Sequence, residues 1–311
     1  MNVLYIILGL LLLIVGGNWL LKAAVGLSLQ LRIPKIVIGM TVVSLATSAP
    51  ELIVSIKSAL DGFPDLALGN VVGSNVANLA LVLGLTIVLS KIDVQESFYK
   101  IDWPVMMFAS VLLYLFLVDD SIIEFYEGAI LFSFLILFLI FLLKFQKTAV
   151  IDEMPEDDEL LPLYKIVFFV VIGAVGLWAG SELLIIGAVQ LAQNFGVSER
   201  VIGITVVSIG TSIPELAASV IAVLKKEKAI SIGNLLGSNI FNILAVLGIT
   251  AMITPVTLRD AELLHYDIFW MLGVSFLILP LVFFPKKLRL DWKDGLILLI
   301  IYGVFIITTL Y

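Results

Sequence analysis

Long apolar segments separated by short polar stretches run along almost the whole chain. A helix needs about 20 predominantly apolar residues to cross a lipid bilayer. On this rule the pattern predicts ten membrane-spanning helices, and therefore an all-α polytopic membrane protein. The expected spans are 3–29, 36–60, 66–89, 103–118, 123–143, 164–192, 200–223, 230–253, 267–284 and 295–310.

The composition agrees with a membrane protein. The chain has 311 residues, of which 61% are hydrophobic and 14% charged, and its mean hydropathy is +1.16. A soluble domain carries about 25% charged residues. The net charge of −7 comes largely from the loops and gives no support for nucleic-acid binding. The absence of cysteine excludes disulfides and thiolate metal sites.

The distribution of basic residues predicts the orientation in the membrane. Lys and Arg concentrate in cytoplasmic loops. The odd-numbered loops between the predicted spans hold 14 of the 18 basic residues. We therefore expect a multi-pass protein of the cell membrane with the odd loops in the cytoplasm and both termini outside. The 14 residues are Arg32, Lys35, Lys91, Lys100, Lys144, Lys147, Lys165, Lys225, Lys226, Lys228, Lys286, Lys287, Arg289 and Lys293.

Part of the sequence occurs twice. The string from Val42 to Glu51 reads VVSLATSAPE, and 164 residues later Val206 to Glu215 read VVSIGTSIPE. Each copy is followed at the same distance by a second string, GNVVGSNVAN in one case and GNLLGSNIFN in the other. Because five spans separate the copies, the second copy must enter the membrane from the opposite side. Inverted repeats with interrupted helices at matching positions are typical of transporters.

The repeat also predicts the domain organisation. Residues 1–145 form the first half with five spans, and residues 164–311 form the second. Residues 146–163 form an acidic cytoplasmic linker between them. The linker does not match an EF-hand loop, which needs a glycine at its sixth position and a glutamate at its twelfth. We interpret it as a solvated, self-repelling segment.

The repeated strings place polar side chains on single helix faces. In the first string these residues follow one another at intervals of three or four, which is helical spacing. They are Ser44, Thr47, Ser48 and Glu51, and in the second copy Ser208, Thr211, Ser212 and Glu215. The second string stacks three residues per copy, namely Asn70, Ser74 and Asn78, and then Asn234, Ser238 and Asn242. Four otherwise apolar helices therefore each carry a stripe of oxygen atoms.

The two glutamates predict a bound cation. A carboxylate inside a membrane span is costly unless it faces a cavity or a positive charge, and the repeated residues include no lysine or arginine. Pro50 has no N–H to offer the carbonyl of Ala46, and Pro214 leaves the carbonyl of Gly210 free in the same way. Carboxylate, carbonyl, hydroxyl and amide oxygens suit Na⁺, or Ca²⁺ with its about six to eight oxygen ligands.

Some of the repeated polar residues have a second interpretation. Small and polar side chains in membrane helices often serve close packing and interhelical hydrogen bonds. Both interpretations stay open for Ser55, Ser219, Asn75 and Asn239, whereas packing is favoured for Gly69, Gly73, Gly233 and Gly237. The chain contains no nucleophile–base pair, phosphate loop or cofactor fingerprint. We therefore expect no enzymatic activity and no cofactor, and no obligate protein partner is evident.

The motifs resemble those of the sodium/calcium exchanger family, prokaryotic type, within the cation/Ca²⁺ antiporter superfamily. Its two alpha repeats carry a G-T-S-x-P-E string and then a G-N-x-x-G-S-N string. The resemblance covers nearly the whole chain, with Ala46 in place of the glycine of G-T-S in the first copy. It implies alternating access, in which Ca²⁺ and Na⁺ compete for one central cluster and the first and sixth helices slide past the other eight.

The resemblance also implies individual ligand roles. Glu51 and Glu215 would be carboxylates that Ca²⁺ and Na⁺ share, and Asn78 and Asn242 would occupy the middle of the cluster. Threonines and serines would supply carbonyl and hydroxyl oxygens, and these are Thr47, Thr211, Ser48, Ser212, Ser74, Ser238, Ser44 and Ser208.

The coupling ion leaves alternatives open. Relatives that also require K⁺ typically carry aspartate where this chain has Asn242, so the resemblance implies exchange that is independent of K⁺. A Ca²⁺/H⁺ antiporter with the same acidic site is an alternative, although such relatives usually have an asparagine-containing string before the glutamate. A passive cation channel is a further alternative, against which the inverted repeat and the acid pair argue.

Overall fold

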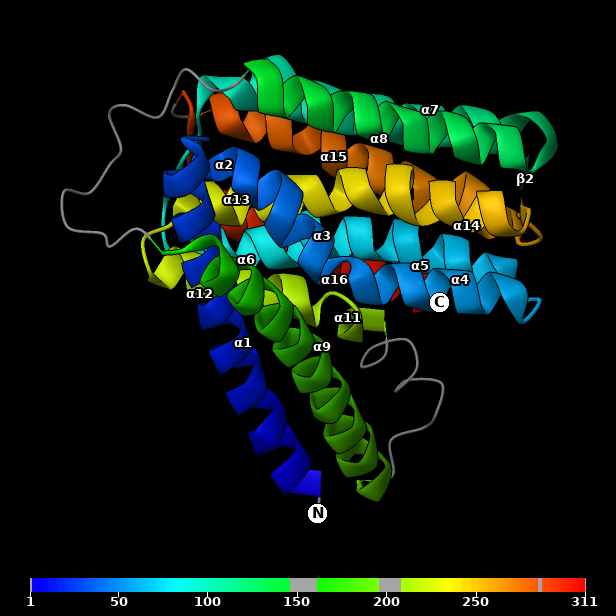
Figure 1. Cartoon of the computed structure of the whole chain (residues 1–311). Coiled ribbons are helices and arrows are strands. Elements are labelled where there is room, and N and C mark those ends of the chain that lie inside the picture. The colour runs from blue at the N-terminus through cyan, green and yellow to red at the C-terminus, as the bar shows by residue number, and fades with distance from the viewer. Residues whose placement is uncertain (1, 146–160, 196–207, 285–286, 311) are drawn as a thin grey trace. The chain divides into compact units, whose positions relative to one another are not determined.

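The computed structural model describes residues 2–145, 161–195, 208–284 and 287–310, which are almost entirely helical (Figure 1). Eight of the described helices are long and apolar enough to cross a membrane, or nine if the bent pair Lys35–Thr47 and Ala49–Leu60 is one span. The predicted seventh span, 200–223, lies partly outside the described residues. Its described part contains a shorter apolar helix, Ile213–Leu224. The count of ten spans therefore stays a prediction.

The chain folds into two compact units, which are described separately. Unit 1 comprises Met1–Thr47 and Leu139–Asn234, and unit 2 comprises Ser48–Phe138 and Leu235–Tyr311. Each unit takes segments from both halves of the sequence repeat.

Unit 1 is built around its two longest helices, α1 and α9 (Figure 1). They have 30 and 32 residues, and at 1.5 Å per residue they are about 45 Å and about 48 Å long. A hydrocarbon core of about 30 Å accommodates such helices when they tilt. The elements of this unit are α1 Asn2–Leu31, α2 Lys35–Ile38, the π-helix η1 Gly39–Val43, α3 Ser44–Thr47, the end of α8 Phe125–Phe145 from Leu139, α9 Leu163–Asn194, α11 Ser208–Gly210, α12 Ile213–Leu224 and the first part of α13 Lys228–Phe241.

Glycines allow α1 and α9 to pack backbone against backbone. A Cβ atom added to Gly9 would lie 2.8 Å from the carbonyl oxygen of Gly180, and one added to Gly16 would lie 2.9 Å from that of Gly173. Small residues at a helix interface permit this approach in membranes, where no hydrophobic effect drives helices together. The early glycine of α1 meets the late glycine of α9 and vice versa, so the two helices run antiparallel.

Unit 2 contains the most buried spans. In Pro64–Leu89 and Lys228–Ile253, 78% and 83% of the apolar window is buried, against 28–33% in the other spans. Protein rather than lipid surrounds these two spans, which permits polar side chains within them. The helices are α4 Ala49–Leu60, α5 Pro64–Val76, η2 Ala77–Val82, α6 Leu83–Leu89, η3 Phe98–Asp102, α7 Trp103–Asp120, α8 Phe125–Phe145 up to Phe138, the end of α13, η6 Asn242–Leu247, α14 Gly248–Ile253, η7 Leu263–Asp267, α15 Ile268–Phe283 and α16 Trp292–Leu310.

Two kinds of contact in unit 2, a strand pair and a glycine pair, each occur twice. In the second occurrence the first and second halves of the sequence exchange roles. The strand β1 Ile92–Asp93 pairs antiparallel with β4 Arg289–Leu290, while β3 Val256–Thr257, which follows β1 by 164 residues, pairs with β2 Ile122–Ile123. Gly84 meets Gly295 on α16, and its repeat equivalent Gly248 meets Gly128 on α8. The repeat in the sequence is thus also a repeat in the contacts.

Candidate cation-binding site

Both copies of the first string contain the expected helix break. α4 and α12 begin directly after Ser48 and Ser212, whose φ/ψ angles are −85°/1° and −86°/3°. These values lie in the sparsely populated bridge region, outside the helical range. Pro50 and Pro214 stand in the first turns of the new helices, where a missing N–H costs nothing. The same local sequence therefore produces the same backbone twice.

Each break is followed by a fully buried glutamate. Glu51 lies in the first turn of α4 in unit 2 and Glu215 in the first turn of α12 in unit 1, and both have 0% exposed surface. The partial positive charge of a helix N-terminus stabilises an acidic side chain in the first turn. This effect is too small by itself to offset the removal of a carboxylate from water. Each glutamate is therefore a candidate cation ligand.

In unit 1, Asn234 gathers the polar residues around it. The Ser44 hydroxyl lies 2.9 Å from the backbone carbonyl oxygen of Asn234, and the Thr47 hydroxyl donates to its side-chain Oδ1 at 3.2 Å. Its Nδ2 donates to the Ser219 hydroxyl at 3.1 Å. Asn234 was part of the predicted stripe but not of the predicted ligand set. Its place one helical turn before Ser238 was the signal for a role.

In unit 2, Asn70 repeats one of these contacts. Its Nδ2 donates to the Ser55 hydroxyl at 3.0 Å, as Asn234 does to Ser219 at 3.1 Å. It also lies 3.4 Å from the backbone carbonyl oxygen of Glu51. Ser55 and Ser219, whose role the sequence left open, therefore each connect α4 or α12 to the next helix.

Four asparagines in unit 2 form a reciprocal cluster, which we call the asparagine clasp: Asn75, Asn78, Asn239 and Asn242. Asn75 Nδ2 donates to the carbonyl of Asn239 at 3.3 Å, and Asn239 Nδ2 donates to that of Asn75 at 3.1 Å. Asn78 Nδ2 donates to Asn239 Oδ1, and Asn242 Nδ2 to Asn75 Oδ1, both at 3.1 Å. Each bond has a counterpart with the two copies of the repeat exchanged.

The clasp leaves two buried amide oxygens as candidate ligands. Asn78 and Asn242 are completely buried, and among the described residues no hydrogen-bond donor reaches the Oδ1 atom of either. A buried acceptor without a donor is costly, and a bound cation removes that cost. The donor set of the clasp therefore fits a hard cation.

The other predicted ligands are mostly buried as well. Ser44, Thr47, Ser48 and Ser212 lie at the breaks, and Ser74 and Ser238 lie on α5 and α13. Thr211 is half-buried, and the side chain of Ser208 lies outside the described residues. Ser44 and Thr47 are brought together by Asn234 in unit 1, and Asn78 and Asn242 by the clasp in unit 2.

One carbonyl that the sequence predicts to be free has a protein donor. The Ser181 hydroxyl of α9 donates to the carbonyl oxygen of Gly210 at 2.8 Å. Pro214 lacks the N–H that would otherwise bond to this carbonyl. A carbonyl oxygen has two lone pairs, so one can still bind a cation. The sequence carried no signal for Ser181, because its partner lies on another helix.

Broken helices that carry buried carboxylate, hydroxyl and amide oxygens are typical of ion-transporting membrane proteins. The sequence profile of the family described as "Sodium/calcium exchanger protein" matches residues 1–144 and 165–311. The chain therefore belongs to the sodium/calcium exchanger family, which comprises antiporters and not enzymes.

Individual proteins are similar over nearly the full length. CaxA of Alkalimonas amylolytica is 38% identical over 96% of this chain and 95% of its own length. The sodium/calcium exchanger MaX1 of Methanosarcina acetivorans is 27% identical over 100% of this chain and 99% of its own. A solved structure of the sodium-calcium exchanger NCX_Mj matches with a TM-score of 0.83 and 26% identity, covering 99% of this chain and 98% of that one.

Proposed function

We propose that the protein is a secondary active antiporter of the cell membrane that exchanges Na⁺ for Ca²⁺ by alternating access, without a requirement for K⁺. The main support for the proposal is that the same helix break occurs in both copies of the repeat. Each break is followed by a fully buried glutamate in the first turn of the next helix. The similarity to proteins named as sodium/calcium exchangers supports it.

Glu51 and Glu215 are the proposed shared carboxylates, whose two negative charges neutralise one Ca²⁺. Asn78 and Asn242 add the amide oxygens that the asparagine clasp leaves without a donor among the described residues. Around them we place oxygens of the residues that flank the two glutamates in sequence or follow in the next helix. These are Ser44, Thr47, Ser48, Ser74, Ser208, Thr211, Ser212 and Ser238.

The proposed architecture is ten spans arranged as two inverted repeats of five helices, residues 1–145 and 164–311, with both termini outside. The antiparallel packing of α1 against α9 supports it, because equivalent helices of inverted repeats run in opposite directions. The exchanged pairs of strands and glycines in unit 2 support it as well. The concentration of basic residues in odd loops supports the orientation.

Coupling follows from the charge of the site. Moving an empty pair of carboxylates across a low-dielectric barrier is costly, and a bound Ca²⁺ or several Na⁺ remove that cost. The carrier therefore changes sides when loaded and not when empty, so that each Ca²⁺ expelled is exchanged for Na⁺.

Asn242 is the basis for proposing independence of K⁺. Its Nδ2 donates a hydrogen bond to Asn75 Oδ1 at 3.1 Å. An aspartate at this position could not donate and would place a third carboxylate in the site. The neutral amide thus limits the charge that the transported ions must balance.

The test is Ca²⁺ uptake into Na⁺-loaded proteoliposomes, measured with choline, K⁺ or Na⁺ as the external cation. We expect rapid uptake in choline, no stimulation by K⁺, and loss of uptake when Na⁺ is present on both sides. Uptake that ignores Na⁺ and follows an imposed pH gradient would instead indicate a proton-coupled antiporter. Ca²⁺ flux without any counter-ion would indicate a channel.

A further inference from the structure

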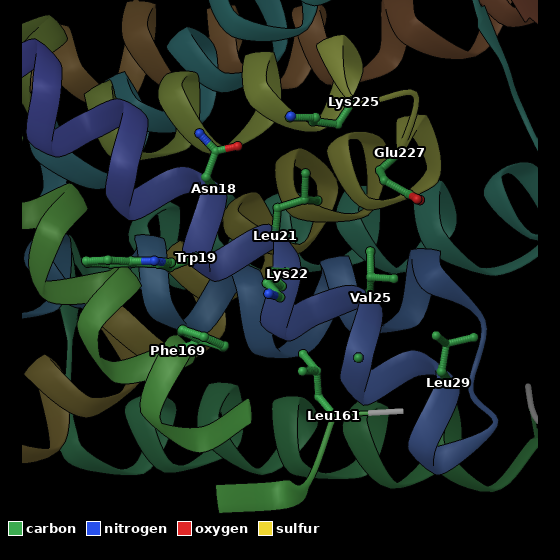
Figure 2. A pocket seen from close by; sticks show the side chains of 11 residues that line it. Asn18, Trp19, Leu21, Lys22, Val25, Leu29, Leu161, Phe169, Lys225 and Glu227 are labelled. Atoms are coloured by element: carbon green, nitrogen blue, oxygen red, sulfur yellow. The ribbon is translucent and has the colours of Figure 1, made fainter. Parts of the chain in front are cut away.

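Unit 1 contains a cavity of about 560 Å³ that the cation-binding site does not use. It lies against α1 and α9 and the segment that follows α12 (Figure 2). Residues of α1 form most of its wall, while Phe169 comes from α9 and Lys225 and Glu227 from the turn after α12. The cavity is therefore confined to one unit.

The charged groups of the cavity add up to a positive site. Lys22 and Lys225 both line it, and Lys22 Nζ lies 5.4 Å from the centre of the Phe169 ring. Glu227 is the one carboxylate among the described residues of the lining, and it pairs with Lys35 at 2.9 Å. Among the described residues neither Lys22 nor Lys225 forms a salt bridge. Two ammonium groups are thus available to an anion.

Polar and apolar surfaces meet in this cavity. In Figure 2 the Lys225 side chain extends in the direction of Asn18, whose Nδ2 donates to the carbonyl oxygen of Ile14 at 2.7 Å. Leu21, Val25 and Leu29 of α1 supply apolar wall on the same helix as Lys22. A ligand that fills the cavity therefore needs an anionic group and an apolar part.

The expected location of the cavity favours a lipid as its ligand. α1 exposes large apolar side chains mainly in its first half, among them Leu4, Ile7 and Leu11, as expected of a helix that faces acyl chains. Lys225 belongs to a loop that we expect at the cytoplasmic surface, where basic pockets between membrane helices bind anionic headgroups. This expected location favours an anionic headgroup as the ligand.

We propose that this cavity binds one anionic phospholipid. Lys22 and Lys225 hold the phosphate, and the apolar residues of α1 contact the upper part of an acyl chain. The recognised group is a phosphate, which free phosphate also offers. The apolar wall is what favours the lipid.

Trp19 lines the cavity and can report binding. The full-length protein in neutral detergent micelles would be titrated with brominated phosphatidylglycerol or brominated phosphatidylcholine, whose bromines quench nearby tryptophans. The signal of Trp19 is the difference in quenching between the wild type and Trp19→Phe. We expect saturable quenching by phosphatidylglycerol, and about thirtyfold weaker binding in the Lys22→Gln/Lys225→Gln double variant, in which two charges are lost.

A matched control is Lys293→Gln, because Lys293 also lies over an aromatic ring, 5.8 Å from the centre of Trp292, but outside the cavity. Its binding should equal that of the wild type, and a Lys22→Arg/Lys225→Arg variant should retain binding. Helicity and elution volume would be compared to establish that each variant is folded. Equal quenching by the two lipids, or unchanged binding in the folded glutamine variant, would overturn the proposal. If inorganic phosphate abolished the Trp19 quenching signal and the two lipids quenched equally, the assignment to a lipid would be wrong.

Discussion

The two copies of the repeat share a backbone but differ in what surrounds it. The breaks before α4 and α12 have nearly the same angles, and the Asn–Ser bonds to the following helix differ by 0.1 Å. The second copy has a serine, Ser181, that donates to the carbonyl of Gly210. In the first copy the equivalent residues, 164 positions earlier, are Gly17 and Ala46. Gly17 has no hydroxyl that could donate to the carbonyl of Ala46.

The difference has a steric basis. A Cβ atom added to Gly17 would lie 2.3 Å from Cδ1 of Ile221, so a serine fits there only if Ile221 moves. At Gly17, α1 therefore packs closely on α12, whereas at the equivalent position α9 has Ser181 and its hydrogen bond to the carbonyl of Gly210. Duplicated sequence preserves the broken helix and its carboxylate, while the contacts of the neighbouring helix differ between the copies.

The largest expected effect tests whether the two copies contribute equally to transport. Glu51→Gln and Glu215→Gln keep the size of the side chain and remove its charge, so we expect each to abolish Ca²⁺ uptake into Na⁺-loaded proteoliposomes. The variants should still fold, because a neutral amide is less costly to bury than a carboxylate. Normal flux in either variant would refute the assignment of that glutamate.

The next effect concerns stability and tests the exchanged contacts in unit 2. A Cβ added to Gly295 would lie 2.6 Å from the carbonyl oxygen of Gly84, and one added to Gly128 would lie 2.7 Å from that of Gly248. We expect Gly295→Ala and Gly128→Ala each to destabilise the protein by about 1–3 kcal/mol, because backbone atoms must move apart. Thermal unfolding in detergent measures this.

Gly303→Ala is the control for these glycine variants. Gly303 lies on α16 with Gly295, and no described heavy atom lies within 4 Å of its added Cβ. Its unfolding temperature should match or exceed that of the wild type, since alanine favours a helix. Similar losses at Gly295 and Gly303 would show that helix α16, and not the close contact, is sensitive.

The asparagine clasp predicts a smaller and symmetric effect. Asn75→Ala and Asn239→Ala each remove a donor and an acceptor and leave groups of the other copy without partners. We expect each to lower the free energy of unfolding by about 1–3 kcal/mol. Because the two side chains form one network, the double variant should lose less than the sum of the single losses. A strictly additive loss in chemical unfolding would contradict the clasp.

The smallest expected effect concerns the difference between the copies. Ser181→Ala frees the carbonyl of Gly210 and should change the half-saturating Na⁺ concentration by about fivefold, the factor that a hydrogen bond of about 1 kcal/mol corresponds to. Ser181→Thr keeps the hydroxyl and should restore the wild-type value. Ser110→Ala removes a buried serine that bonds within its own helix, to Met106, and should leave Na⁺ dependence unchanged. Identical Na⁺ curves for Ser181→Ala and the wild type would rule out this role.

The sequence by itself determined the local features of this protein. The apolar segments predicted a helical membrane protein, and the helix break at Ser48 follows from Pro50, which acts within one turn of chain. The burial of Glu51 follows from its place in an apolar helix. Packing was favoured for Gly233, and an added Cβ there would lie 2.3 Å from the carbonyl oxygen of Ile36. Such features depend on neighbours in sequence or on helical periodicity.

Only the tertiary structure decided which distant groups meet. Asn234 accepts a hydrogen bond from the hydroxyl of Thr47, 187 residues away in the sequence. Asn75 and Asn239, which are hydrogen-bonded to each other, are 164 residues apart. Periodicity places such a side chain on a helix face but does not say which helix that face meets. The same limit applied to Ser181 and to the cavity beside Lys22, because hydrogen-bond partners and cavity walls arise from the packing of several helices.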